Sequence, residues 1–204
     1  MMSIMRNERL NARAAAKEET HARIVAVAAR AIRRSGYDGT GVADIMKEAG
    51  LTHGAFYAHF DSREAMLAEA AGQACAESAD AIAGVVGSVP ADKTVEAMLR
   101  AYLSKEHLDN TEVGCPLAAL GSETSRQAPD VRRVTTRHIK AMVDLAARQS
   151  PDWGQPAAHE RAMVTVATMV GALLLARAVD EPALSDSLRE AALQHLLTTT
   201  TTTS

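Results

Sequence analysis

Residues 40–60, TGVADIMKEAGLTHGAFYAHF, constrain the fold more than any other stretch of the chain. The first half places apolar residues at the i, i+3, i+4, i+7 spacing of one helix face: Val42, Ile45, Met46 and Ala49. Gly50 follows where a helix should stop, at a position that tolerates a left-handed backbone. A second short segment then runs to residue 60. Two short helices joined by a glycine turn predict a helix-turn-helix, which offers its second helix to the DNA major groove.

The second segment divides into two faces. Phe56 and Phe60, the only phenylalanines of the chain, lie four residues apart and should enter a small core. His53 and Tyr57 have the same spacing and should point elsewhere. An ordinary helical hairpin without a DNA role has the same pattern, so the spacing alone leaves both interpretations open.

Small and capping residues complete this stretch. Gly54 and Ala55 would let the backbone come close to a duplex, and an alanine can contact a thymine methyl group. Thr40 and Thr52 stand where their hydroxyls could cap the two helices.

Residues 23–67 resemble the DNA-binding region of the TetR (tetracycline-repressor-like) family of bacterial transcription regulators. The matching motifs fall in the family's order and spacing: Gly36-Tyr37, Ala49-Gly50-Leu51 and the run Gly54-Ala55-Phe56-Tyr57-Ala58-His59-Phe60. The resemblance implies that the partner is a double-stranded DNA operator. It covers the first third of the chain and says little about a ligand.

The resemblance also implies nine DNA-binding residues. Those expected at the DNA backbone are Thr40, Lys47, Thr52, Tyr57, His59 and Arg63. Those expected near base edges are His53, Gly54 and Ala55. His53 departs from the smaller or basic residue of many family members, so the operator sequence cannot be predicted from it.

Composition and charge agree with a helical DNA-binding protein. Hydrophobic residues make up 47% of the 204 residues but aromatic residues only 3%. Such a composition favours helices over sheets, and we expect an all-α fold. Residues 1–47 hold nine Lys and Arg against five Asp and Glu, a net charge of +4, and the remainder carries −7. A basic N-terminal end on an acidic body suits phosphate contact at one end, although chance asymmetry would look the same.

The pattern predicts four regions. Residues 1–19 should form a flexible basic N-terminal arm, either frayed or lying along DNA phosphate. Residues 20–62 should form the helix-turn-helix domain, with a first helix from about residue 18 to residue 35. Residues 63–197 should form a larger helical domain, with helices near 63–86, 92–107, 129–149, 157–179 and 184–197. The threonine run 198–204 should be disordered.

Residues 162–176 are almost entirely apolar but too few to span a bilayer, which needs about 20 residues. The N-terminus also lacks the apolar core of a signal peptide, so we expect a cytoplasmic protein without a membrane partner. A helix that is apolar nearly all round must be covered on more than one side. The resemblance implies a homodimer formed by the last two helices, with these dimerisation residues: Met163, Val166, Val170, Leu173, Leu174, Leu188 and Leu196.

The resemblance further implies a small-molecule effector that binds the second domain and releases a repressor from a palindromic operator. Periodicity places eight residues at a possible ligand pocket, although ordinary core packing is the simpler explanation of each: Met98, Tyr102, Leu103, Cys115, Leu120, His138, Met142 and Met169.

Cys115 supports an alternative function. It precedes Pro116 at a predicted helix start, where the helix dipole makes a thiolate more reactive, so the protein could be a thiol-based redox or electrophile sensor. A free cysteine is otherwise a small buried hydrophobe, as we expect for Cys75. The two cysteines have no metal or disulfide spacing. The sequence also lacks a nucleophile elbow, a zinc-binding His pair and a phosphate-binding glycine loop, so we predict no enzyme activity, metal or cofactor.

Overall fold

The computed structural model describes residues 2–150 and 152–201, and the regular elements of this part of the chain are all helical. This confirms the predicted all-α fold. The α-helices are α1 (Met2–Ser35), α2 (Val42–Glu48), α3 (Arg63–Gly87), α4 (Thr94–Tyr102), α5 (Lys105–Asp109), α6 (Pro116–Thr124), α7 (Pro129–Arg148), α8 (Pro156–Ala178) and α9 (Pro182–Thr201). Short 3₁₀ helices are η1 (His53–Ala58), η2 (Ala91–Lys93) and η3 (Thr111–Val113).

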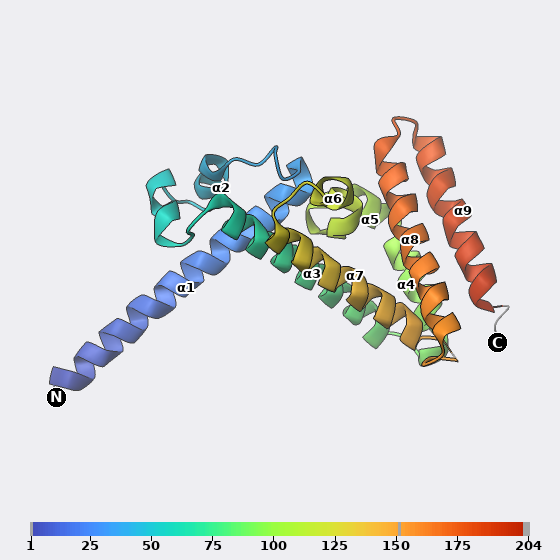
Figure 1. Cartoon of the computed structure of the whole chain (residues 1–204), viewed down its shortest axis with the longest axis horizontal. Helices are drawn as coiled ribbons and strands as arrows, with labels where there is room; N and C mark the ends of the chain where they lie inside the picture. The colour runs from blue at the N-terminus through green and yellow to red at the C-terminus, as the bar shows by residue number, and fades with distance from the viewer. Residues whose placement is uncertain (1, 151, 202–204) are drawn as a thin grey trace.

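The second half of α1 packs with α2, η1 and the start of α3 to form the head of the molecule (Figure 1). Apolar residues from all four elements are at most 4% exposed in its core: Ile24, Ile32, Ile45, Met46, Phe56, Phe60, Met66 and Leu67. Burying a side chain of this size stabilises a fold by about 1.5–3 kcal/mol. The head is therefore held by a core and not by its short helices alone.

The core of the head continues beyond α3. Leu120 of α6 and Val131 of α7 belong to it, and both are 1% exposed. Tyr37, in the loop after α1, is buried in the same cluster. The head is consequently packed onto the second part of the chain without an intervening linker, and the division at residue 62 stays a prediction.

The second core lies between α4, α6, α7, α8 and α9. It includes Leu99, Met142, Met169, Leu173 and Leu196. Figure 1 shows α3 and α7 running side by side, and α8 and α9 as an antiparallel pair at the end of the molecule away from the N-terminus. The C-terminal pair therefore stands apart from the head and is connected to it through α5, α6 and α7.

The first helix begins much earlier than the sequence predicted. We expected it to start near residue 18 after a flexible arm, but α1 begins at Met2 and projects from the body (Figure 1). Residues 2–17 are mostly good helix formers and contain neither glycine nor proline, so nothing interrupts the helix. The expected arm is thus a continuous extension of α1.

Two predicted caps are wrong. The N-cap of α2 is Gly41, which has no side chain to cap the helix, and the buried Thr40 hydroxyl donates to the carbonyls of Ala31 and Gly36. Thr52 precedes η1 but makes no side-chain capping bond. Ser62 does cap α3, since its hydroxyl oxygen accepts from the Ala65 N–H at 3.1 Å.

The predicted glycine stops are confirmed. Gly36 follows α1 with φ +77°, and Gly50 follows α2 with φ +73°. Both values fall in the left-handed region, where a side chain beyond Cα is strained.

Later helix boundaries differ in two places. The single helix expected over 92–107 is divided into η2, α4 and α5, since Ser104 interrupts it and caps α5 by accepting from the His107 N–H. Part of the expected disordered tail is helical, because α9 runs to Thr201. The hydroxyls of Thr198 and Thr199 donate to carbonyls four residues back, which keeps them within the helix. Residues 202–204 lie outside the described residues.

Buried His138 should make stability depend on pH. It is 5% exposed, its Nε2 has no hydrogen-bond partner among the described residues, and burial lowers the pKa of its imidazole. Because the folded-state pKa is below the unfolded one, the stability contribution is present above the unfolded pKa and is lost as the pH falls. We expect His138→Leu to raise the free energy of unfolding by about 1 kcal/mol at pH 7.5, and by more at pH 5.5.

Urea unfolding at the two pH values measures this effect. His195→Leu is the matched control, because His195 is exposed on α9 and forms no ion pair among the described residues, so its substitution should not reproduce the effect of His138→Leu. A His138→Leu variant that is less stable than the parent at both pH values would contradict the prediction.

Candidate functional site

The docking of η1 decides which side chains the head presents to solvent. Phe56 and Phe60 are 3% and 4% exposed, and their rings stack at 5.5 Å between centroids. With these two residues turned inward, His53, Gly54 and Tyr57 are exposed on the opposite side of η1. The two faces predicted from the spacing are therefore present.

Tyr57 is the most exposed large hydrophobic side chain among the described residues, at 72%. Its ring lies 5.3 Å from Phe56 and 6.2 Å from His53, with both pairs edge to face. Such aromatic pairs are worth about 0.5–1.5 kcal/mol each beyond the buried area. The ring is thus held in one direction although solvent surrounds it.

The nine predicted DNA-binding residues are not equally accessible. The exposed members are Lys47, Thr52, His53, Gly54 and Tyr57. The half-buried members are Ala55, His59 and Arg63. Thr40 is buried, with 5% of its surface exposed.

Thr40 and Arg63 have an internal role that the resemblance did not imply. The Thr40 hydroxyl donates to the Gly36 carbonyl at 2.7 Å and to the Ala31 carbonyl at 3.2 Å. The Arg63 guanidinium donates to the carbonyls of Tyr37 and Thr40. Together they fix the loop between α1 and α2 onto the start of α3.

A polar cluster supports the end of η1. His21 of α1 lies 2.6 Å from the Glu69 carboxylate of α3, and its ring stacks on Phe60 at 4.5 Å. The His59 ring is 5.9 Å from His21, and its Nδ1 is buried with no partner among the described residues. Burial, together with His21 and Lys17, lowers the pKa of His59. His59 is consequently neutral at pH 7.

The sequence did not predict His21 or Glu69 as parts of this surface. They are separated by 48 residues and share no motif, so only the folded head brings them together. A histidine on the apolar side of a helix, as at position 21, is the one sequence signal that could have pointed to them.

The eight predicted ligand residues are all at most 9% exposed. Leu120 packs in the core of the head, whereas Tyr102, Leu103, Cys115, Met142 and Met169 pack in the second core. The hydroxyl of Tyr102 and Nε2 of His138 are buried without a hydrogen-bond partner among the described residues. Burial, with Cys115 close by, raises the pKa of Tyr102 well above its ordinary value.

Cys115 stands at the start of α6, as the sequence predicts, and its side chain is buried. The residue is 1% exposed. Nδ1 of neighbouring His107 donates to the Tyr102 carbonyl at 2.6 Å, and Nε2 accepts from the Cys115 N–H at 2.9 Å. With both ring nitrogens engaged, His107 cannot take a proton from the thiol. Burial raises the pKa of the Cys75 thiol to about 12.

A cleft of about 770 Å³ opens at a place the sequence did not predict. It lies between the end of α1, α5, η3, α6 and the turn from α8 to α9, and none of the eight predicted ligand residues lines it. Drug-sized ligands occupy pockets of about 300–1,000 Å³. The cleft could hold an effector of this size, beside the junction of the head with the C-terminal helices.

The outer side of α8 is apolar and uncovered. Met163, Val164 and Leu175 are 46%, 62% and 51% exposed. Ala167, also exposed, and half-buried Gly171 lie between them at helical spacing. Among the predicted dimerisation residues Val166, Leu173 and Leu196 are buried within this chain, Val170, Leu174 and Leu188 are half-buried, and Met163 is exposed.

A metal site and a membrane-spanning helix are two further possibilities for the described residues. No group of three or more His, Cys, Asp or Glu side chains that could hold a metal ion is found there. By length and composition α8 is the one described helix that could cross a membrane, and 28% of its most apolar 18-residue stretch is buried. The core helix of a folded domain can have the same length and apolar composition.

Two family models match most of the chain. Residues 24–70 match the model of bacterial regulatory proteins of the tetR family, and residues 91–193 match the C-terminal domain of LmrA/YxaF-like transcriptional regulators. An HTH-type transcriptional regulator of Mycobacterium tuberculosis is 30% identical over 164 residues, which cover 76% of this chain and 82% of the relative.

Solved structures have the same fold. A TetR transcriptional regulator of Chloroflexus aurantiacus is 27% identical with a TM-score of 0.74, over 89% of this chain and 94% of that chain. Reduced NemR of E. coli is 21% identical with a TM-score of 0.73, over 87% of this chain and 95% of that chain. At this identity the likeness to NemR shows the fold alone.

The different settings of Arg63 and Lys47 predict different effects on stability. Arg63→Met removes the charged donor from two carbonyls, and we expect it to lower the free energy of unfolding by about 2 kcal/mol. Lys47→Met changes an exposed side chain on α2 and should alter stability by less than about 0.5 kcal/mol. Urea unfolding of both variants measures this. Equal stability of the two variants would contradict the internal role of Arg63.

Proposed function

Because the chain belongs to the TetR family of bacterial transcriptional regulators and binds DNA as such, we propose the form that its regulation takes. We propose that the protein is a homodimeric repressor that leaves a palindromic operator when a small molecule binds its second domain. The observation that carries the DNA part is the exposed side of η1, which is held outward by buried Phe56 and Phe60.

The exposed residues of the head have separate roles in this proposal. Lys47 on α2 and Tyr57 on η1 contact phosphate and position the head, since phosphate contacts set register without reading sequence. His53, Gly54 and Ala55 approach the base edges, where a glycine lets the backbone come close. His59 is half-buried in its cluster with His21, and it supports the end of η1 beside the DNA.

The uncovered side of α8 is the proposed dimer contact. A strip of Val164, Ala167, Gly171 and Leu175 is too apolar to remain in water, and its small central residues let a second helix approach closely. Half-buried Leu188 on α9 is a further residue expected at this contact. Two heads related by a two-fold axis would meet successive major grooves about 34–36 Å apart. A covered α8 is also consistent with a cytoplasmic protein.

The ligand response is expected from the second domain. Unpartnered polar atoms on Tyr102 and His138 lie within its core, and the cleft beside α5 offers space next to the head. An effector acts only through a difference in affinity between the DNA-bound and free states, so DNA must weaken effector binding by the same factor.

A thiol-based sensor acting through Cys115 is the alternative. The helix start favours it, but the thiol is 1% exposed and both ring nitrogens of His107 are engaged elsewhere. An oxidant would have to open the second core to reach the sulfur. The alternative requires that Cys115→Ser abolishes the response, whereas a ligand-responsive repressor keeps it.

DNA binding can be tested with a duplex from the region upstream of the protein's own gene, by fluorescence anisotropy at several salt concentrations. We expect Tyr57→Ala to weaken binding at least tenfold, and Lys47→Gln to reduce the salt slope by about one counterion. Trp153→Ala is the matched control, since Trp153 is an exposed aromatic residue outside the head. Undiminished binding by Tyr57→Ala would contradict the proposed surface.

The dimer contact can be tested by light scattering after size-exclusion chromatography. Val164→Glu and Leu175→Glu should give monomers that retain the helical circular dichroism of the parent, because the two side chains are exposed in a single chain. Val113→Glu in η3 is the control, since Val113 is similarly exposed but belongs to another element. Dimers of unchanged affinity in both α8 variants would place the contact elsewhere.

A further inference from the structure

The cleft beside α5 contains both acidic and basic side chains, but they are not equally satisfied. Arg34 pairs with Glu48 at 2.9 Å and Glu112 at 3.2 Å, and Lys105 pairs with Asp109 at 3.1 Å. Each exposed positive charge at the cleft therefore already has a carboxylate beside it.

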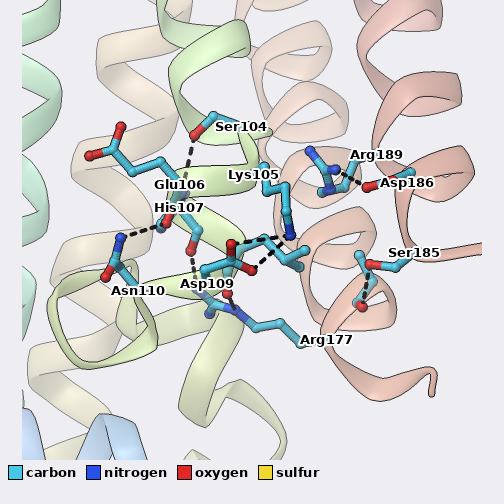
Figure 2. A network of polar contacts seen from close by, with 12 residues as sticks. Ser104, Lys105, Glu106, His107, Asp109, Asn110, Arg177, Ser185, Asp186 and Arg189 are labelled. Atoms are coloured by element: carbon cyan, nitrogen blue, oxygen red, sulfur yellow. Dashed lines mark hydrogen bonds and ion pairs between the residues drawn. The ribbon is translucent and has the colours of Figure 1, made fainter. Parts of the chain in front are cut away.

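Arg177 of α8 is also engaged. Its guanidinium donates to the carbonyls of His107 at 2.6 Å and Leu108 at 3.2 Å, as Figure 2 shows. Its remaining nitrogen is sealed from solvent and does not face the open space. This arginine thus binds the main chain of α5 and offers no accessible donor to a ligand.

The acidic side chains Glu123 and Asp180 differ from these bases. Neither forms an ion pair with a basic side chain in the part of the chain that the structure describes. Arg177 is the one basic side chain of the lining without a carboxylate partner among the described residues, since it meets only main-chain carbonyls. The helices α1 and α8 end at the cleft and α9 begins there, so helix ends of both signs face it. Two carboxylates without an ion pair therefore face the cleft against one such arginine, and the balance is negative.

We propose that this cleft binds a small organic cation, an amine or quaternary ammonium with an apolar body. The ammonium lies beside Glu123 and Asp180, and the body lies against apolar wall residues such as Leu108 and Val179. This inference rests on the proposed effector-responsive function and names the chemical class of the effector.

Glu123 connects the site to the head. Its carboxylate accepts from the Tyr37 N–H at 2.9 Å and lies directly against Gly36, where an added Cβ would be 2.7 Å from Oε1. Tyr37 is 1% exposed in the core of the head, and its carbonyl accepts from Arg63. A cation that draws the carboxylate into the cleft loosens the loop between α1 and α2. The position of α2 and η1 then changes, and DNA affinity falls.

Calorimetry on the full-length protein tests the site with three probes that share a benzyl group and differ in charge. Benzyltrimethylammonium is the cation, its carbon isostere neopentylbenzene is neutral, and phenylacetate is the anion. We expect the cation alone to bind. Glu123→Gln, which keeps an oxygen acceptor for the Tyr37 N–H, and Asp180→Asn should each weaken the cation about tenfold. Asp92→Asn, an exposed carboxylate change outside the cleft, should not.

The outcomes separate this inference from the proposed function. Equal cation affinity in the parent and both cleft variants would overturn it, as would preferred binding of phenylacetate or no cation binding at millimolar concentration. DNA binding without effector is measured in parallel and is independent of these results. The cation should also weaken DNA binding by the parent, and DNA affinity that is unaffected by bound cation would overturn the coupling through Glu123. Melting temperatures of the variants check that each is folded.

Discussion

Three arginines from three helices hold one short segment, and the arrangement of the two ends of the molecule depends on them. Arg33 of α1 donates to the Gly114 carbonyl, Arg177 of α8 to those of His107 and Leu108, and Arg189 of α9 to that of Leu103. Figure 2 shows Arg177 and Arg189 at this segment. Residues 103–114 contain only one short α-helix and one 3₁₀ turn, and the arginines satisfy four of their carbonyls that would otherwise need partners from outside. These bonds join the C-terminal helices to α1.

This way of connecting the ends differs from a hinge. Arg33 has its side chain buried and also pairs with Glu77 of α3, so α1, α3 and the segment are fixed to one another. The head core is closed by Leu120 and Val131 from beyond α3. A movement at α8 or α9 therefore reaches the head through packed side chains and charged hydrogen bonds, which have discrete arrangements. In the proposed regulation, the change therefore occurs in the loop between α1 and α2 rather than between two separate bodies.

Much of this fold could be predicted from the sequence because the decisive signals are local. Helical spacing in 42–49, the stops at Gly36 and Gly50, and proline at the starts of α6 and α7 each involve residues within one or two turns. Thr40 shows where local reasoning fails: its side chain is turned into the head, its hydroxyl donates to the carbonyls of Ala31 and Gly36, and Gly41 takes the N-cap position of α2. Leu120 was predicted to line a pocket because helical spacing shows which side of a helix is apolar. Spacing does not show which core that side packs against, and Leu120 packs in the core of the head. The cleft could not be predicted from the sequence for the same reason, since its walls come from segments as far apart in the sequence as α1 and α9.

Gly36 has a consequence for how this protein can change over evolutionary time. Its backbone lies in the left-handed region, and a methyl group there would also strike the Glu123 carboxylate. The left-handed backbone restricts how the loop can fold, and the close carboxylate restricts how the loop packs against α6. Gly36 itself belongs neither to the DNA-facing surface nor to the α8 strip. A substitution tolerated by the backbone would still displace the carboxylate permanently. Such a mutant would be a folded protein in which the proposed coupling between the cleft and the head is lost. Its defect would appear in the response of DNA binding to an effector before it appeared in the free energy of unfolding.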